Sequence, residues 1–193
     1  NCVYPIIGVK EYGWSFIGSD IDTVAIASAQ KIVDENAILK GRVELRLQPN
    51  AEDIFKGILQ KDELVDLTIC NPPFHASLAE AQAGTLRKLT NLTEKKTTKP
   101  ILNFGGHPNE LWCEGGERVF SANMILQSKE FGSDVFWFST LISKQTHLKM
   151  RYAEAVDVKT FPMGQGNKSS RLVAWTFLSP DAQKEWVKAR WQE

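Results

Sequence analysis

Along the first third of the chain, strand-like and helix-like patterns alternate, and this alternation limits the chain to very few folds. The segments 16–18, 43–48 and 64–70 are apolar or alternate between apolar and polar residues, as strands do. Between them, residues 23–39 carry apolar side chains at helical spacing, and residues 53–59 resemble a short helix. Strands that alternate with helices usually pair in parallel. The sequence therefore predicts an α/β fold with a mostly parallel sheet.

The second half of the chain predicts a further helix pair, an apolar strand, a hairpin and a closing helix. The expected segments are helices at 120–131 and 144–155, a strand at 133–143, hairpin strands at 156–163 and 171–178, and a helix at 179–192. This order is that of the Rossmann-like methyltransferase fold. We expect a single domain over residues 1–193, interrupted at about 77–120 by an insertion too long for an ordinary connection.

Charge and cysteine content exclude several classes of protein. The 23 basic and 23 acidic residues cancel, so there is no general electrostatic attraction to nucleic acid. Cys2, Cys70 and Cys113 have neither the number nor the spacing of a disulfide framework or a zinc site. They fit free thiols in a reducing cytosol. We expect no metal, and no membrane span, because no apolar run is long enough.

The predicted strand at 64–70 ends in an unusual corner, in which Asn71 is followed by Pro72, Pro73 and Phe74. Asparagine and proline are common turn residues, so the plainest interpretation is a turn that stops the strand. However, the corner also stands at the carboxyl end of a parallel strand, where open α/β sheets bind their ligands. In that place it suits a reaction at the exocyclic amine of a base.

Such an amine is a poor nucleophile, because its lone pair is delocalised into the ring. The Asn71 side-chain oxygen and the Pro72 carbonyl can each accept a hydrogen bond from one of the two N–H groups of the amine. These two hydrogen bonds draw the nitrogen towards a tetrahedral shape. The prolines hold that carbonyl in place at little entropic cost. Phe74 offers a stacking face worth about 1–3 kcal/mol per base, and asparagine is a natural partner of the adenine edge that carries N6. The base must then be unpaired or flipped out of its helix.

Acidic and amide side chains follow the two preceding strands. Asp20 ends the first strand, where a carboxylate can accept from the ribose hydroxyls of an adenosine-containing cofactor. Asp22 suits the cap of the next helix better, although both acids could serve only as caps. Asn50 and Asp53 follow the second strand, near where the cofactor adenine would lie, and Asp53 is equally plausible as a helix N-cap.

The histidines and the cations of the insertion give weaker indications. His75 follows the corner and could line a pocket, but nothing in the sequence pairs it with a nucleophile or a metal. His107 and His147 are expected to be ordinary loop and helix residues. Arg87 and Lys88 could contact phosphates, although a solvated loop is the default interpretation.

Three segments carry a resemblance to a known family: ICNPPFHASLAEAQAGTLRKL, LNFGGHPNELWCEGGE and SSRLVAWTF. They closely resemble the bacterial 23S ribosomal RNA adenine-N6 methyltransferases, and the likeness covers essentially the whole chain. A more distant likeness is to the eukaryotic methyltransferase that acts on U6 small nuclear RNA. That enzyme shares the NPPF corner, an EGGE loop and a last strand that carries an arginine.

The resemblance implies a class I methyltransferase fold, S-adenosylmethionine as the methyl donor and a cytoplasmic enzyme. The acceptor would be the N6 amino group of a specific adenine in 23S rRNA. By position, Asn71, Pro72, Pro73 and Phe74 would be the catalytic tetrad and Asp20 the ribose ligand. The residues of an expected substrate-side loop are Glu114, Gly115, Gly116 and Glu117.

Members of the family carry an Asp-rich and Gly-rich strand and turn just before the segment that matches the start of this chain. That turn receives the methionine part of the cofactor, and Asn1 is the one residue of it present here. We therefore expect the chain to lack the first strand of the sheet and to expose unpaired strand edges. On its own it should bind S-adenosylmethionine weakly or not at all.

Two other functions stay open. Ribosomal RNA guanine-N2 methyltransferases resemble the chain around NPPFH, and the corner chemistry applies equally to the exocyclic amine of guanine. The EGGE loop and the last strand favour adenine. A non-catalytic RNA-binding or scaffold protein could keep the same fold; the intact Asn71 and Phe74 argue against this alternative, whereas the neutral charge leaves it open.

Overall fold

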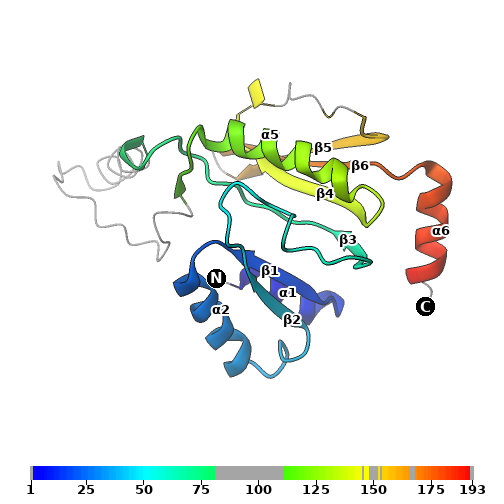
Figure 1. Ribbon diagram of the computed structural model, residues 1–193, viewed down its shortest axis with the longest axis horizontal. Coiled ribbons are helices and arrows are strands. Elements are labelled where there is room, and N and C mark those ends of the chain that lie inside the picture. The colour runs from blue at the N-terminus through cyan, green and yellow to red at the C-terminus, as the bar shows by residue number, and fades with distance from the viewer. Residues whose placement is uncertain are drawn as a thin grey trace. The chain divides into compact units, whose positions relative to one another are not determined.

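The computed structural model describes residues 2–80, 111–144, 146–147, 152, 154–165 and 168–191. Within them the chain forms two compact units, Asn1–Gln60 and Lys61–Glu193 (Figure 1). The candidate residues Asn1, Arg87 and Lys88 lie outside the described residues, and so do His107 and most of the insertion expected at 77–120. No helix in the described part of the chain has the length and apolar character needed to cross a membrane.

The first unit contains two helices and two parallel strands. In chain order these are α1 (Val3–Tyr12), β1 (Phe16–Asp20), α2 (Thr23–Glu35) and β2 (Val43–Leu47). β1 pairs with β2 in parallel, and Asp20 lies opposite Leu47 at the carboxyl end of the pair. Cys2, Val33 and Leu39 are buried at the centre of the core, where apolar residues of both helices and of β2 pack against them.

The helices of this unit follow from local signals. Asp22 caps α2, because its side chain accepts a hydrogen bond from the amide of Val24, as expected from the sequence. The helix ends at Glu35 rather than at 39, because Asn36 adopts an extended conformation. The sequence patterns did not reveal α1, which packs against β1 through Gly8. A Cβ at Gly8 would lie 2.3 Å from the ring of Phe16, so a larger residue would require the ring or the helix to move.

The prediction of a helix at 53–59 is wrong, because this segment forms turns. The carbonyl of Phe55 accepts hydrogen bonds from the amides of Ile58 and Leu59, which would start a helix. Gly57 has a φ of +80°, outside the right-handed helical region, and this interrupts the helical path. Phe55 and Ile58 are nevertheless buried, so the apolar spacing that suggested a helix reflects packing of the turns.

The described residues of the second unit form a four-stranded sheet with helices. Its elements are β3 (Val65–Leu67), α5 (Gly116–Ser128), the 3₁₀ helix η1 (Lys129–Phe131), β4 (Val135–Ile142), β5 (Asp157–Gln165), β6 (Lys168–Thr176) and α6 (Pro180–Arg190). The strand order is β3-β4-β6-β5, in which β3 and β4 are parallel and the other pairs are antiparallel. Figure 1 shows α5 lying along β4 on one face of this sheet.

The expected apolar strand and terminal hairpin are confirmed. β4 lies between β3 and β6 and is buried at six of its eight positions, as a central strand covered by a helix should be. β6 lies between β4 and β5, which leaves β5 at the edge of the sheet. The helix expected at 144–155 lies partly outside the described residues. Within it, Glu154 has a φ of +76°, so a regular helix does not extend that far.

The closing helix α6 is held to β3 by one carboxylate. Asp66 accepts hydrogen bonds from the indole N–H groups of Trp186 (2.7 Å) and Trp191 (2.9 Å). The Arg190 guanidinium donates to both carboxylate oxygens, at 3.0 and 2.8 Å. Hydrogen bonding to Arg190, supported by the two indoles, lowers the pKa of Asp66 to about 2 against the opposing effect of burial.

Asp66→Asn is expected to destabilise the second unit by about 1 kcal/mol. A shift from the ordinary 3.8 to about 2 corresponds to roughly 2 kcal/mol, which we discount because the Asp66 side chain is 40% exposed. Because the pKa is lowered in the folded state, this stabilisation is present above pH 4 and is lost as the pH falls towards 2. Urea unfolding at pH 7 and pH 2.5 checks it: the wild type and the variant should differ at pH 7 and converge at low pH. An equal difference at both pH values would contradict this.

Candidate active site

The strand that leads to the NPPF corner keeps its pairing with β4 beyond the end of β3. The amide of Thr68 donates to the carbonyl of Trp137 at 2.9 Å, and the amide of Leu141 donates to the carbonyl of Cys70 at 3.0 Å. The Ser139 hydroxyl also donates to the carbonyl of Thr68, at 2.6 Å. The corner therefore begins where this parallel pairing ends, at the carboxyl end of the strands as expected.

The four residues of the corner differ sharply in exposure. Pro72 is among the largest fully buried side chains, whereas Asn71 is exposed and Pro73 and Phe74 are half-buried. The buried ring anchors the backbone and leaves the Asn71 amide accessible. Burial raises the pKa of the neighbouring Cys70 thiol to about 11, so it is protonated and not nucleophilic at neutral pH. The chemistry available here is that of hydrogen-bond acceptors and an aromatic face.

The EGGE loop and the residues just before it contact the segment that directly follows the corner, through backbone groups. The amide of His75 donates to the carbonyl of Leu111, and the amide of Cys113 donates to the carbonyl of His75, both at 3.1 Å. Gly115 and Gly116 then take φ values of +73° and +62° and turn the chain into α5. A Cβ at Gly116 would lie 3.0 Å from the amide nitrogen of Ala76. Glycine is therefore needed for so close an approach.

The four loop residues fall into two pairs. Glu114 and Gly115 are exposed, as a substrate-side role requires. Gly116 and Glu117 are buried, and the Glu117 side chain is only 1% exposed. Its carboxylate accepts hydrogen bonds from the Ser143 amide (2.9 Å) and hydroxyl and contacts Nδ1 of His147 at 2.6 Å.

The expected cofactor residues of the first unit share one end of their sheet. One carboxylate oxygen of Asp20, Oδ1, accepts the amide of Asp22 at 2.9 Å. The amide of Gln48 donates to the Asp20 carbonyl at 2.8 Å, and its side-chain oxygen accepts the amide of Asn50. The Asn50 side chain donates to Asp53 at 2.8 Å. Asp53 is therefore part of a turn with Asn50 rather than a helix cap.

The sequence patterns did not reveal three residues that organise the loop after β2 and the surroundings of Glu117. Gln48 is 5% exposed and orders the loop after β2 by donating to the carbonyl of Lys56 and accepting from the amide of Asn50. Ser143 and His147 meet Glu117 across 26 and 30 residues of sequence, a separation that no local pattern signals. No group of three or more potential metal ligands occurs among the described residues.

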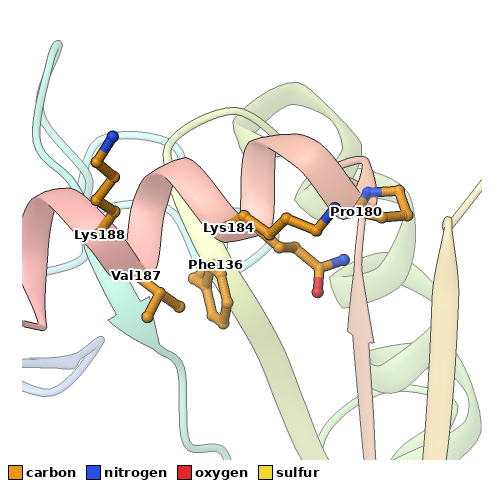
Figure 2. A pocket seen from close by; sticks show the side chains of 6 residues that line it. Phe136, Pro180, Lys184, Val187 and Lys188 are labelled. Atoms are coloured by element: carbon orange, nitrogen blue, oxygen red, sulfur yellow. The ribbon is translucent and has the colours of Figure 1, made fainter.

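An open groove of about 450 Å³ lies elsewhere on the second unit, between α6 and β4. Figure 2 shows Val187 and Phe136 side by side in it, with Lys188 pointing away from them. Phe136 is near the start of β4, and the NPPF corner adjoins the other end of that strand. The groove is therefore separate from the corner.

A parallel strand pair completed by an antiparallel hairpin, with β6 inserted between β4 and β5, is the class I methyltransferase fold. The solved hMettl16 catalytic domain, in complex with MAT2A 3'UTR hairpin 1, matches 93% of this chain and 61% of that chain, with a TM-score of 0.73 and 26% identity. The N-terminal domain of human METTL16 in complex with SAH matches 92% of this chain and 58% of that chain, with a TM-score of 0.65 and 22% identity.

A family described as RNA methyltransferase matches residues 1–179, and the chain belongs to this family. A curated relative from Cytophaga hutchinsonii, named ribosomal RNA large subunit methyltransferase F, is 62% identical over 100% of this chain and 61% of the relative. The chain thus spans about three fifths of the length of that relative.

Proposed function

We propose that the chain carries the catalytic corner of an enzyme that methylates the N6 amino group of a specific adenine in 23S rRNA. The observation that carries the proposal is the NPPF corner at the carboxyl end of β3, with Asn71 exposed and Pro72 buried. The family and the name of the Cytophaga relative support RNA, and ribosomal RNA in particular, as the substrate. A bacterial enzyme of this kind acts in the cytoplasm.

In this proposal the corner holds the base and prepares its amine. The Asn71 side-chain oxygen and the Pro72 carbonyl each accept a hydrogen bond from one N–H group of the amine. Because the Pro72 ring is buried, its carbonyl stays fixed, and little reorganisation is needed during the reaction. Phe74 stacks on the flipped base. His75, Glu114 and Gly115 lie next in the chain or in the loop paired with it and form the substrate side. Arg87 and Lys88 stay predicted phosphate contacts.

S-adenosylmethionine is the proposed methyl donor, and its sulfonium supplies an already activated methyl group without a metal. The residues of the first unit fit this molecule. Asp20 stands at the carboxyl end of β1, and its Oδ2 receives no hydrogen bond from the described residues, so it can accept from a ribose hydroxyl. The loop of Asn50 and Asp53 at the same sheet end would face the adenine. SAH in the human METTL16 structure supports this choice of donor.

Asp20→Ala is expected to weaken S-adenosylmethionine binding by about 10- to 100-fold, the loss of one or two charge-assisted hydrogen bonds. Asp22→Ala is the matched control: it removes the α2 cap, costs about 1 kcal/mol of stability and leaves affinity unchanged. Calorimetric titration of the chain with its natural flanking sequence measures both. Equal affinity in the wild type and Asp20→Ala would remove Asp20 from the cofactor site.

The function itself is tested by transfer of a labelled methyl group. The chain, with its natural flanking sequence, is incubated with labelled S-adenosylmethionine and unmodified 23S rRNA, and the RNA is digested to nucleosides. Label in N6-methyladenosine is the expected result. Label in N2-methylguanosine would replace adenine by guanine as the acceptor, and RNA that binds without label would favour a non-catalytic protein.

A further inference from the structure

Glu117 is the one acidic side chain in the buried set of described residues, and it needs an explanation. Burying a carboxylate is costly unless hydrogen bonds and charges compensate it. Its oxygens accept from the amide and hydroxyl of Ser143 and, at 3.4 Å, from the amide of Lys144. His147 contacts the second oxygen. Its position in the first turn of α5 adds a favourable interaction with the helix dipole.

These contacts join two chain segments at one end of the sheet. Ser143 directly follows the last residue of β4, and β4 is parallel to β3, whose extension leads into the corner. The residue before Glu117, Gly116, packs against the backbone of His75 and Ala76, which directly follow the corner. Glu117 therefore fixes Ser143, Lys144 and His147 relative to the residues that follow the NPPF corner, through the N-terminal end of α5.

Lys144 places an exposed cation in this fixed segment. Its amide is held by Glu117, and its side chain forms no ion pair within the described residues. The Glu80 carboxylate accepts a hydrogen bond from the amide of Ala76 at 2.8 Å, and this bond, with a smaller contribution from the Lys144 charge, lowers the pKa of Glu80. Glu117, which holds the Lys144 amide, directly follows Gly116, and Gly116 packs against the backbone of His75 and Ala76, so Lys144 lies beside the residues that follow the corner.

We propose that Glu117 is a positioning residue that holds Ser143, Lys144 and His147 so that Lys144 contacts a phosphate next to the flipped base. This inference rests on the proposed function. It separates Glu117 from Glu114 and Gly115, which stay candidates for direct substrate contact. It also gives the chain a local phosphate contact that its neutral net charge does not indicate.

Glu117→Gln tests the positioning role. The amide can no longer supply two anionic oxygens to the donors of Ser143, Lys144 and His147. We expect hydrogen exchange at the Ser143 and Lys144 amides to rise by about 10-fold or more, while exchange within β4 stays unchanged. S-adenosylmethionine affinity should be unchanged, and kcat/KM for RNA should fall by about 10-fold. Glu130→Gln, an exposed glutamate just after α5, is the control and should change nothing.

Lys144→Met tests the phosphate contact. KM for RNA should rise several-fold, and the slope of log KM against log salt should decrease by about 0.7 to 1, the value for one phosphate contact. Lys184→Met on α6 is the matched control, and its salt slope should equal that of the wild type. An unchanged slope in Lys144→Met would overturn the phosphate contact.

The other outcomes are equally decisive. The positioning role would be overturned if hydrogen exchange at the Ser143 and Lys144 amides stayed slow in Glu117→Gln. It would also be overturned if hydrogen exchange rose equally throughout β4. Fast exchange at 143–144 with unchanged kcat/KM would overturn the link to RNA. If the wild type transfers no methyl group to RNA, the proposed function fails, and salt-dependent RNA binding and hydrogen exchange still decide the roles of Lys144 and Glu117.

Discussion

Replacing Asn71 by alanine is expected to lower kcat for methyl transfer by about 10²–10³-fold, comparable to the loss of one preorganised transition-state hydrogen bond. The side chain is exposed and makes no hydrogen bond within the described part of the chain, so the fold should be unaffected. What is lost is the acceptor that draws the base amine towards a tetrahedral shape. Single-turnover rates with saturating RNA and cofactor isolate this step from binding.

Asn36→Ala is the matched control for this change. It also removes an asparagine amide, but one that donates to the carbonyl of Ile32 at the C-terminal end of α2. Stability should fall by about 1 kcal/mol, the ordinary net value of a hydrogen bond, and kcat should be unchanged. Asn71→Asp keeps an acceptor oxygen and should retain more activity than Asn71→Ala. Turnover in Asn71→Ala within twofold of the wild type would exclude Asn71 from the mechanism.

The elements that sequence patterns predicted well are those determined by neighbouring residues. β4 is apolar at six of its eight positions and buried at six, and a run of that kind can be recognised locally. α6 begins at Pro180 and is capped by Ser179, whose side chain accepts a hydrogen bond from the amide of Ala182. The segment 53–59 has helical spacing too, but Gly57 within it takes a positive φ, which that spacing does not encode.

The candidate site divides in the same way. The NPPF corner is four consecutive residues, so its position at a strand end followed from the strand before it. The pairing of Glu117 with Ser143 and His147 depends on β4 running parallel to β3 and on α5 lying along β4 (Figure 1), and neither can be derived from residues 26 to 30 positions apart. The contact of Asp66 with Arg190 spans 124 residues and was missed for the same reason.

Trp175 is the side chain whose removal should destabilise the second unit most. It is completely buried on β6 and stacks on Phe138 of the neighbouring β4, with ring centroids 5.8 Å apart. Its indole N–H donates to the buried hydroxyl of Ser128 at 2.9 Å, which ties the C-terminal end of α5 to the sheet. Truncation of a buried aromatic side chain to alanine costs about 3–5 kcal/mol through lost transfer energy and the cavity that remains.

Trp175→Ala should therefore lower the free energy of unfolding by about 3–5 kcal/mol, measured by urea denaturation followed by circular dichroism. Trp175→Phe keeps an aromatic ring against Phe138 but leaves the Ser128 hydroxyl without its donor, so it should cost less than the alanine variant. Trp14→Ala is the control, because Trp14 is 44% exposed and its removal leaves no closed cavity. If Trp175→Ala cost no more than Trp14→Ala, α5 would be held to the sheet by other contacts, and the close approach of Gly116 to the corner would not depend on this part of the core.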